Sequence, residues 1–99
     1  MPENPLAALA RLDPELMEHL KRTDELVYSD GAVPRKMKLL IAMAFDAAHG
    51  AVSGVRALAG QAKAAGATNQ EMAEVLRVAC HLNGVGALYA ASAALKEPD

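Results

Sequence analysis

A segment of very small side chains at the centre of this 99-residue chain leaves few folds open to it. Residues 48–68 read AHGAVSGVRALAGQAKAAGAT, in which alanine and glycine dominate. Alanine has the highest helix propensity, so the segment predicts a helix whose small side chains let neighbouring helices approach closely. Glycine in an exposed helix interior costs about 1 kcal/mol relative to alanine. We therefore expect a close helix crossing rather than a glycine-based ligand site at the small positions Gly50, Gly54, Ala57, Gly60 and Ala64.

Signals for helix ends recur along the rest of the chain, whereas no segment alternates as a strand would. Asp13 before Pro14 fits an N-cap, and Thr68 with Glu71 has the spacing of a capping box. Further breaks are expected at Pro34, Gly50, Gly66 and the pair Asn83-Gly84. Together these signals predict an all-α chain of about five helices, with a central antiparallel pair formed by Pro34–His49 and Ala51–Ala65.

Composition excludes several classes of protein. The length predicts one domain over residues 1–99, and a formal net charge of −2 without a basic stripe argues against a nucleic-acid partner. A single cysteine, Cys80, excludes an internal disulfide and fits a reducing compartment. The N-terminal residues lack a signal-peptide pattern, and the uncharged stretch Val78–Leu95 is too rich in alanine and too interrupted to span a membrane. We expect a cytoplasmic protein with no membrane partner and no cofactor.

Three stretches resemble a known family. SDGAVPRKMKLLIAMAFDAAHGA, AKAAGATNQEMAEVLRVA and NGVGALYAASAAL are similar to the carboxymuconolactone decarboxylase family, which includes the alkylhydroperoxidase D-like proteins. The resemblance covers residues 29–95. It implies an all-helical bundle that assembles as a trimer or hexamer. The short chain, with one helix apolar on most sides, independently favours self-association because such a chain buries limited surface alone.

The resemblance also implies that the reactive groups of the redox branch are missing. That branch carries Cys-x-x-Cys-x-x-x-His at the start of the central helix and a glutamate about a dozen residues upstream. Anchored on the AGAT sequence, the positions of the two cysteines, the histidine and the glutamate hold Ala51, Gly54, Leu58 and Leu39. The chain therefore lacks the thiols and the acid/base pair that a dithiol peroxidase cycle needs.

Few titratable groups remain near that helix. Asp46 and His49 stand three apart and can share a helix face, and His81 lies beside the Asn83-Gly84 break, so these are the candidate acid/base residues. The alternative is that both histidines are ordinary helix-end residues. Cys80 fits a small buried hydrophobe, and a zinc site would need three ligands brought together, so no metal is expected. Nothing in the sequence singles out Tyr28 or Tyr89, and Arg35, Lys38 and Arg56 fit a solvated surface.

Two functions follow as hypotheses. The preferred one is a non-redox small-molecule-binding or assembly protein, with a small apolar or carboxylate ligand in a narrow, apolar pocket near residues 46–54. We expect His49 to lie near that pocket without a complete catalytic set around it. The alternative is an enzyme, either lactone decarboxylase-like or hydroperoxide-reducing, that uses relocated acid/base residues or Cys80.

Overall fold

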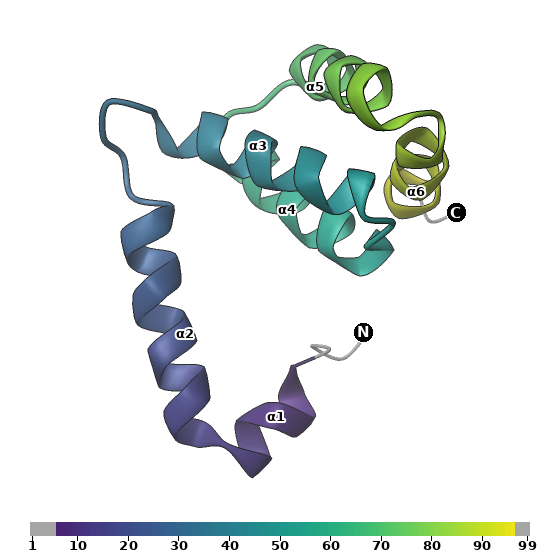
Figure 1. Cartoon of the computed structure of the whole chain (residues 1–99). Helices are drawn as coiled ribbons and strands as arrows, with labels where there is room; N and C mark the ends of the chain where they lie inside the picture. The colour runs from purple at the N-terminus through teal and green to yellow at the C-terminus, as the bar shows by residue number, and fades with distance from the viewer. Residues whose placement is uncertain (1–5, 97–99) are drawn as a thin grey trace.

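The computed structural model describes residues 6–96, which form six α-helices and no strand (Figure 1). The small-residue segment forms α4 (Val52–Ala64), which lies beside α3 (Arg35–Ala48) as the predicted central pair. Helices α5 (Asn69–Asn83) and α6 (Gly86–Leu95) complete a four-helix bundle with them. Before the bundle come α1 (Ala7–Leu12) and α2 (Pro14–Val27). The all-α fold is confirmed, and α1 is a helix that the sequence did not predict.

The predicted helix ends form as expected. Asp13 accepts a hydrogen bond from the Leu16 N–H at 3.0 Å, and Thr68 and Glu71 make both bonds of a capping box, at 3.0 and 2.9 Å. The connections after α3, α4 and α5 contain Gly50, Gly66 and Gly84, whose φ angles of 76°, 101° and 96° favour glycine. These local signals therefore fix where the chain turns.

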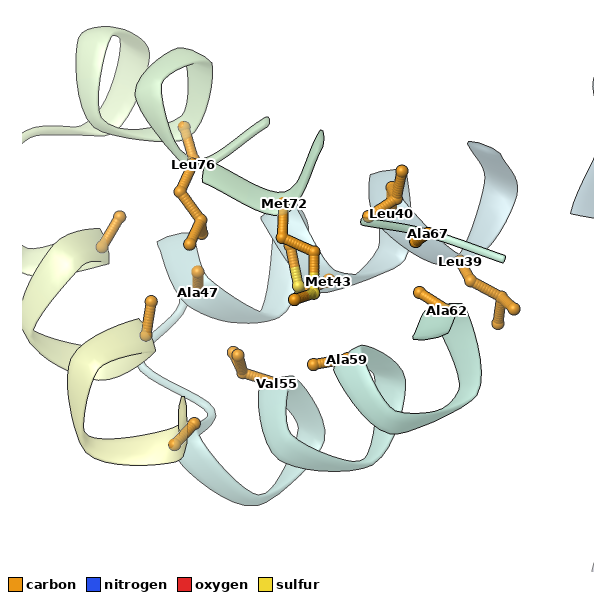
Figure 2. Close-up of a cluster of buried hydrophobic side chains, with 14 residues drawn as sticks. Leu39, Leu40, Met43, Ala47, Val55, Ala59, Ala62, Ala67, Met72 and Leu76 are labelled. Atoms are coloured by element: carbon orange, nitrogen blue, oxygen red, sulfur yellow. The ribbon is translucent and has the colours of Figure 1, made fainter. Parts of the chain in front are cut away.

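The core lies between α3 and the helices around it (Figure 2). Leu39, Leu40 and Met43 on α3 are fully buried, and Met72 and Leu76 on α5 pack into the same cluster. Helices α4 and α6 contribute mainly alanines, such as Ala59 and Ala91. Small side chains thus let these helices pack closely, as the sequence indicates.

The two glycines of α4 differ in their surroundings, and the expectation of a close helix crossing is wrong for Gly60. The face of α4 that enters the core carries Val55, Ala59 and Ala62. Gly60 is exposed, and a Cβ placed there would meet nothing within 4 Å. Gly54 faces the side chain of Asp46 instead of a backbone. The periodicity of α4 explains the difference from the prediction, because Gly60 falls outside the face that Val55, Ala59 and Ala62 bury in the core.

Helices α1 and α2 form an arm that stands away from the bundle (Figure 1). None of their residues is buried, and their main helix–helix contact is with each other. The connection to α3 is nevertheless tied down, since the Asp30 carboxylate accepts the Arg35 backbone N–H at 2.7 Å and Lys38 Nζ donates to the Ser29 carbonyl at 2.7 Å. Across residues 6–96, no helix has the length and apolar character needed to cross a membrane.

Arg56 and Lys36 connect elements of the bundle. Arg56 donates from Nε to the Ala94 carbonyl at 3.1 Å and from Nη2 to the Ala93 carbonyl at 3.4 Å, so it caps the end of α6 rather than facing only solvent. Lys36 Nζ lies 2.9 Å from Glu71 Oε2 and links the start of α3 to the start of α5. The role predicted for Arg56 is therefore corrected, because α6 packs across α4 at this point.

Candidate functional site

A cleft of about 710 Å³ separates the arm from the central helix pair. Helix α2 and the following Tyr28 form one wall, and α3 and α4 form the other. The apolar part of its lining comes from both walls, and the charged side chains are Lys21, Asp24, Glu25, Arg35 and Asp46. The predicted narrow, apolar pocket is thus corrected. The arm lies outside the segment from which that pocket was predicted, and it brings charged side chains to the cleft.

Asp46 and Gly54 lie against each other in the lining of this cleft. A Cβ placed on Gly54 would lie 2.8 Å from Asp46 Cγ and closer still to Oδ2. Because real Cβ atoms essentially never come so close, the carboxylate occupies space that only glycine leaves free. Gly54, the third residue of α4, therefore leaves the room that the Asp46 side chain occupies.

The Asp46 carboxylate has no hydrogen-bond or ion-pair partner within residues 6–96. The same residues contain no buried side-chain oxygen that lacks a partner, so the carboxylate oxygens must reach the solvent of the cleft. An ionised carboxylate accepts hydrogen bonds only. Asp46 thus offers a free acceptor and a negative charge to a molecule in the cleft.

Tyr28 places a hydroxyl group near this carboxylate. Burial of the half-buried side chain raises the pKa of Tyr28, and the charges of Asp24 and Asp46 raise it further, whereas Arg35 lowers it. Arg35 also donates from Nη1 to the Tyr28 carbonyl at 3.3 Å, which holds the end of the arm against α3. The phenol is therefore neutral at physiological pH and able to donate one hydrogen bond.

The positions that the redox branch would use are divided between cleft and core. Gly54 and Leu58 line the cleft. Ala51 is partly buried just before α4, and Leu39 has no exposed surface and belongs to the core. Neither wall of the cleft supplies a thiol or an imidazole. The cleft thus adjoins two of the positions that the sequence resemblance predicts as reactive, and its lining presents Asp46 and Tyr28.

The histidines and Cys80 do not line this cleft. His49 is exposed at the end of α3, and its Nδ1 lies 2.8 Å from the Phe45 carbonyl of the same helix. His81 is exposed on α5, and Cys80 is partly buried rather than fully buried as expected. Among the described residues, no ion pair or hydrogen bond joins Asp46 to either histidine. The catalytic roles of Asp46, His49 and His81 remain predictions.

The described part of the chain also contains no candidate metal site. Over residues 6–96, no group of three histidine, cysteine or acidic side chains is arranged to hold an ion.

Sequence reasoning missed Tyr28, Asp24 and Arg35 as parts of one site. Asp24 and Tyr28 stand one helical turn apart, which is a usable signal. Their proximity to Asp46 depends on the direction in which the arm runs relative to α3. No local sequence pattern encodes that direction. The Asp46–Gly54 fit was missed for the same kind of reason, because it joins two helices.

Comparison with known proteins supports the fold and the resemblance. The model of the carboxymuconolactone decarboxylase family matches residues 14–97. A crystal structure of a carboxymuconolactone decarboxylase family protein from Legionella pneumophila, in its apo form, is similar with a TM-score of 0.84 and 31% sequence identity. The match covers 92% of this chain and 81% of that chain. No curated protein sequence matches this chain.

Proposed function

The chain belongs to the carboxymuconolactone decarboxylase family, and on this scaffold we propose that it is a non-redox protein that binds a small molecule in the cleft between the arm and α3–α4. The observation that carries the proposal is the Asp46 carboxylate, which is seated against Gly54 and has no partner in the described chain. A binding site typically combines apolar walls with a few polar groups that fix the ligand's orientation. Asp46 and Tyr28 supply such groups beside Leu20 and Leu58.

The charge of Asp46 decides between ligand classes. The cleft lining carries two cations, Lys21 and Arg35, and three carboxylates, those of Asp24, Glu25 and Asp46. A carboxylate ligand, as the sequence suggests, would bring a further negative charge toward this acidic excess. An ammonium group would instead place N–H donors on Asp46, and charge-assisted hydrogen bonds of this kind are about twice as strong as neutral ones. The site therefore favours a small organic cation with an apolar portion that packs against the leucines.

Benzylamine and benzoate test this preference, because they share an aromatic ring and carry opposite charges. We expect benzylamine to bind the wild-type protein in a calorimetric titration and benzoate to bind at least ten-fold more weakly. Asp46→Asn should abolish the difference between the two probes, whereas Glu18→Gln, an exposed change on α2 outside the cleft, should leave it intact. Equal affinity of both probes for the wild type would contradict the proposed charge selectivity.

A second candidate is an enzyme that uses relocated acid/base groups. It is favoured by one observation, the presence of a free carboxylate and a neutral phenol in the same cleft. In such an enzyme Asp46 would accept a proton and Tyr28 would hydrogen-bond to the developing negative charge. Turnover of a lactone acid that is lost in Asp46→Asn but retained in His49→Gln would favour this candidate over simple binding.

Thiol chemistry makes a separate prediction. With one cysteine in the sequence, an intramolecular disulfide cannot form, so a Cys-x-x-Cys peroxidase cycle is not expected. Thiol-dependent hydroperoxide reduction should be absent in the wild type. A robust rate that disappears in Cys80→Ser would instead support a one-cysteine reaction and contradict the non-redox proposal.

A further inference from the structure

Two opposite charges of α3 line the cleft between the arm and α3–α4, and they lie far apart along it. Arg35 begins α3, Asp46 stands near its end, and both belong to the cleft lining. About three helical turns separate them, so they share one face of the helix and lie about 16 Å apart along its axis. The acidic excess of the lining is therefore unevenly distributed, because one end of the α3 wall carries a cation.

The α4 wall matches this division. Gly54, near the start of α4, lies against Asp46. Gln61 stands about two turns further along α4 and lines a second cavity together with Arg35. Between these two positions α4 contributes two apolar side chains to the cleft, those of Ala57 and Leu58. Along the α3–α4 pair the cleft thus has an acidic end, an apolar middle and a basic end.

Helix α2 adds charges of both signs within little more than one turn. Lys21, Asp24 and Glu25 all line the cleft, and residues three or four apart are neighbours on a helix surface. Because these charges differ in sign over so short a distance, α2 does not give the cleft an acidic and a basic end. The separation of charge comes from α3.

The Arg35 guanidinium has donors left for a ligand. Its Nη1 donates to the Tyr28 carbonyl at 3.3 Å, and within residues 6–96 no ion pair joins it to a carboxylate. The Asp30 carboxylate accepts the backbone N–H of Arg35 rather than its side chain. A guanidinium carries five N–H donors and can bind a carboxylate through two parallel hydrogen bonds.

The open space continues beyond Arg35. A second cavity of about 730 Å³ shares Arg35 and Gln61 with the cleft and extends along the start of α3 and the end of α4. Lys36 also lines it, but its ammonium group is paired with Glu71 at 2.9 Å. Among the described residues of this cavity, Arg35 is therefore the cation without an acidic partner, and a group bound to it has room.

We propose that the ligand of the cleft is an elongated amphoteric molecule, with an ammonium group on Asp46, a carboxylate on Arg35 and an apolar chain between them. This inference rests on the proposed function and narrows its ligand from an organic cation to a molecule charged at both ends. The spacing along α3 sets the length, because an α-amino acid, which carries both charged groups on one carbon, is too short to reach both residues. Arg35 then makes a charge-assisted contact that a simple amine cannot use.

Two pairs of probes test the second charge and its distance from the first. ω-Aminooctanoate and its methyl ester share the ammonium group and the chain and differ in the carboxylate charge. γ-Aminobutyrate and its methyl ester repeat this difference on a shorter chain. In calorimetric titrations of the wild type, ω-aminooctanoate should bind at least ten-fold more tightly than its ester. The γ-aminobutyrate pair should show no such gain, because its carboxylate does not reach Arg35.

Variants of Arg35 test which residue provides the gain. Arg35→Gln should bring the affinity of ω-aminooctanoate down to that of its methyl ester, and Arg35→Lys should retain part of the gain because the charge remains. Arg77→Gln, an exposed change on α5 outside both cavities, should leave the ten-fold difference intact. An equal loss of both probes in Arg35→Gln would overturn the inference, since Arg35 would then act by holding the arm through the Tyr28 carbonyl.

Failure of this inference and failure of the proposed function give different results. Equal binding of ω-aminooctanoate and its ester by the wild type, with both lost in Asp46→Asn, would overturn the contact with Arg35 and leave the cationic site at Asp46 in place. Absence of binding by both of these probes and by benzylamine would overturn the proposed function together with the inference.

Discussion

At the scale of single residues, the least expected feature is the dependence of Gly54 on Asp46. The sequence shows both residues but not their contact, because they lie on different helices and meet only when the α3–α4 pair forms. Asp46 could be chosen in advance as a candidate, whereas Tyr28 could not, since its burial depends on the position of the arm.

Gly54 and Gly60 form a natural pair for measuring this dependence, since both lie within α4. Gly60→Ala should stabilise the protein by about 1 kcal/mol, the helix-propensity difference, because nothing surrounds its Cβ. Gly54→Ala should gain less than this, because the methyl group must first displace the Asp46 carboxylate at the end of its side chain. In the Asp46→Ala background Gly54→Ala should gain more than in the wild type, with a coupling of about 0.5 kcal/mol or more in urea unfolding. Equal gains at both glycines in the wild type would contradict the fit.

Tyr28 provides a spectroscopic probe of the charge around the cleft. Its pKa is raised by burial and by Asp24 and Asp46, so tyrosinate absorbance in a Tyr89→Phe protein should develop above the ordinary pH range. Asp46→Asn should lower this pKa, whereas Glu18→Gln should not. Because the folded-state pKa is the higher one, the associated stability is present below the unfolded pKa, near 10, and is lost as pH rises through the folded value. An unchanged Tyr28 pKa in Asp46→Asn would contradict the prediction, because it would mean that the Asp46 charge does not act on the phenol.

At the scale of the helices, local signals account for most of what could be predicted. N-caps, glycines with positive φ and apolar periodicity define α2 to α6 because each acts within a few residues. Helix α1 was missed because it is a single short segment without a side-chain cap or a buried face. The role of Arg56 was missed because the carbonyls that it binds belong to α6, far along the chain.

The capping box of α5 predicts a defined loss of stability. Thr68→Ala removes the acceptor for the Glu71 N–H and should destabilise the protein by about 1 kcal/mol. Thr23→Ala makes the same change within α2, where the hydroxyl bonds to the His19 carbonyl of its own helix. That control should be neutral or slightly stabilising because alanine is the better helix former. Thermal unfolding of both variants checks the prediction, which an equal effect of the two changes would refute.

At the scale of the whole molecule, the arm determines the site. The cleft exists because α1 and α2 stand away from the bundle while Arg35, Asp30 and Lys38 hold the connection in place. The sequence predicts the bundle well, since its core follows from helix periodicity. It does not predict the direction of the arm, which packs no buried side chain and so leaves no strong hydrophobic pattern.

The central claim is that a small cationic ligand occupies the cleft beside Asp46, and the position of a bound probe tests it most directly. With benzylamine at saturation, intermolecular nuclear Overhauser effects should connect its ring protons to the side chains of Tyr28, Leu20 and Leu58. These effects should be lost in Asp46→Asn. Effects confined to Phe45, Val78 and Leu82 would place the probe in a separate apolar pocket between α3 and α5 and contradict the assignment of the binding site.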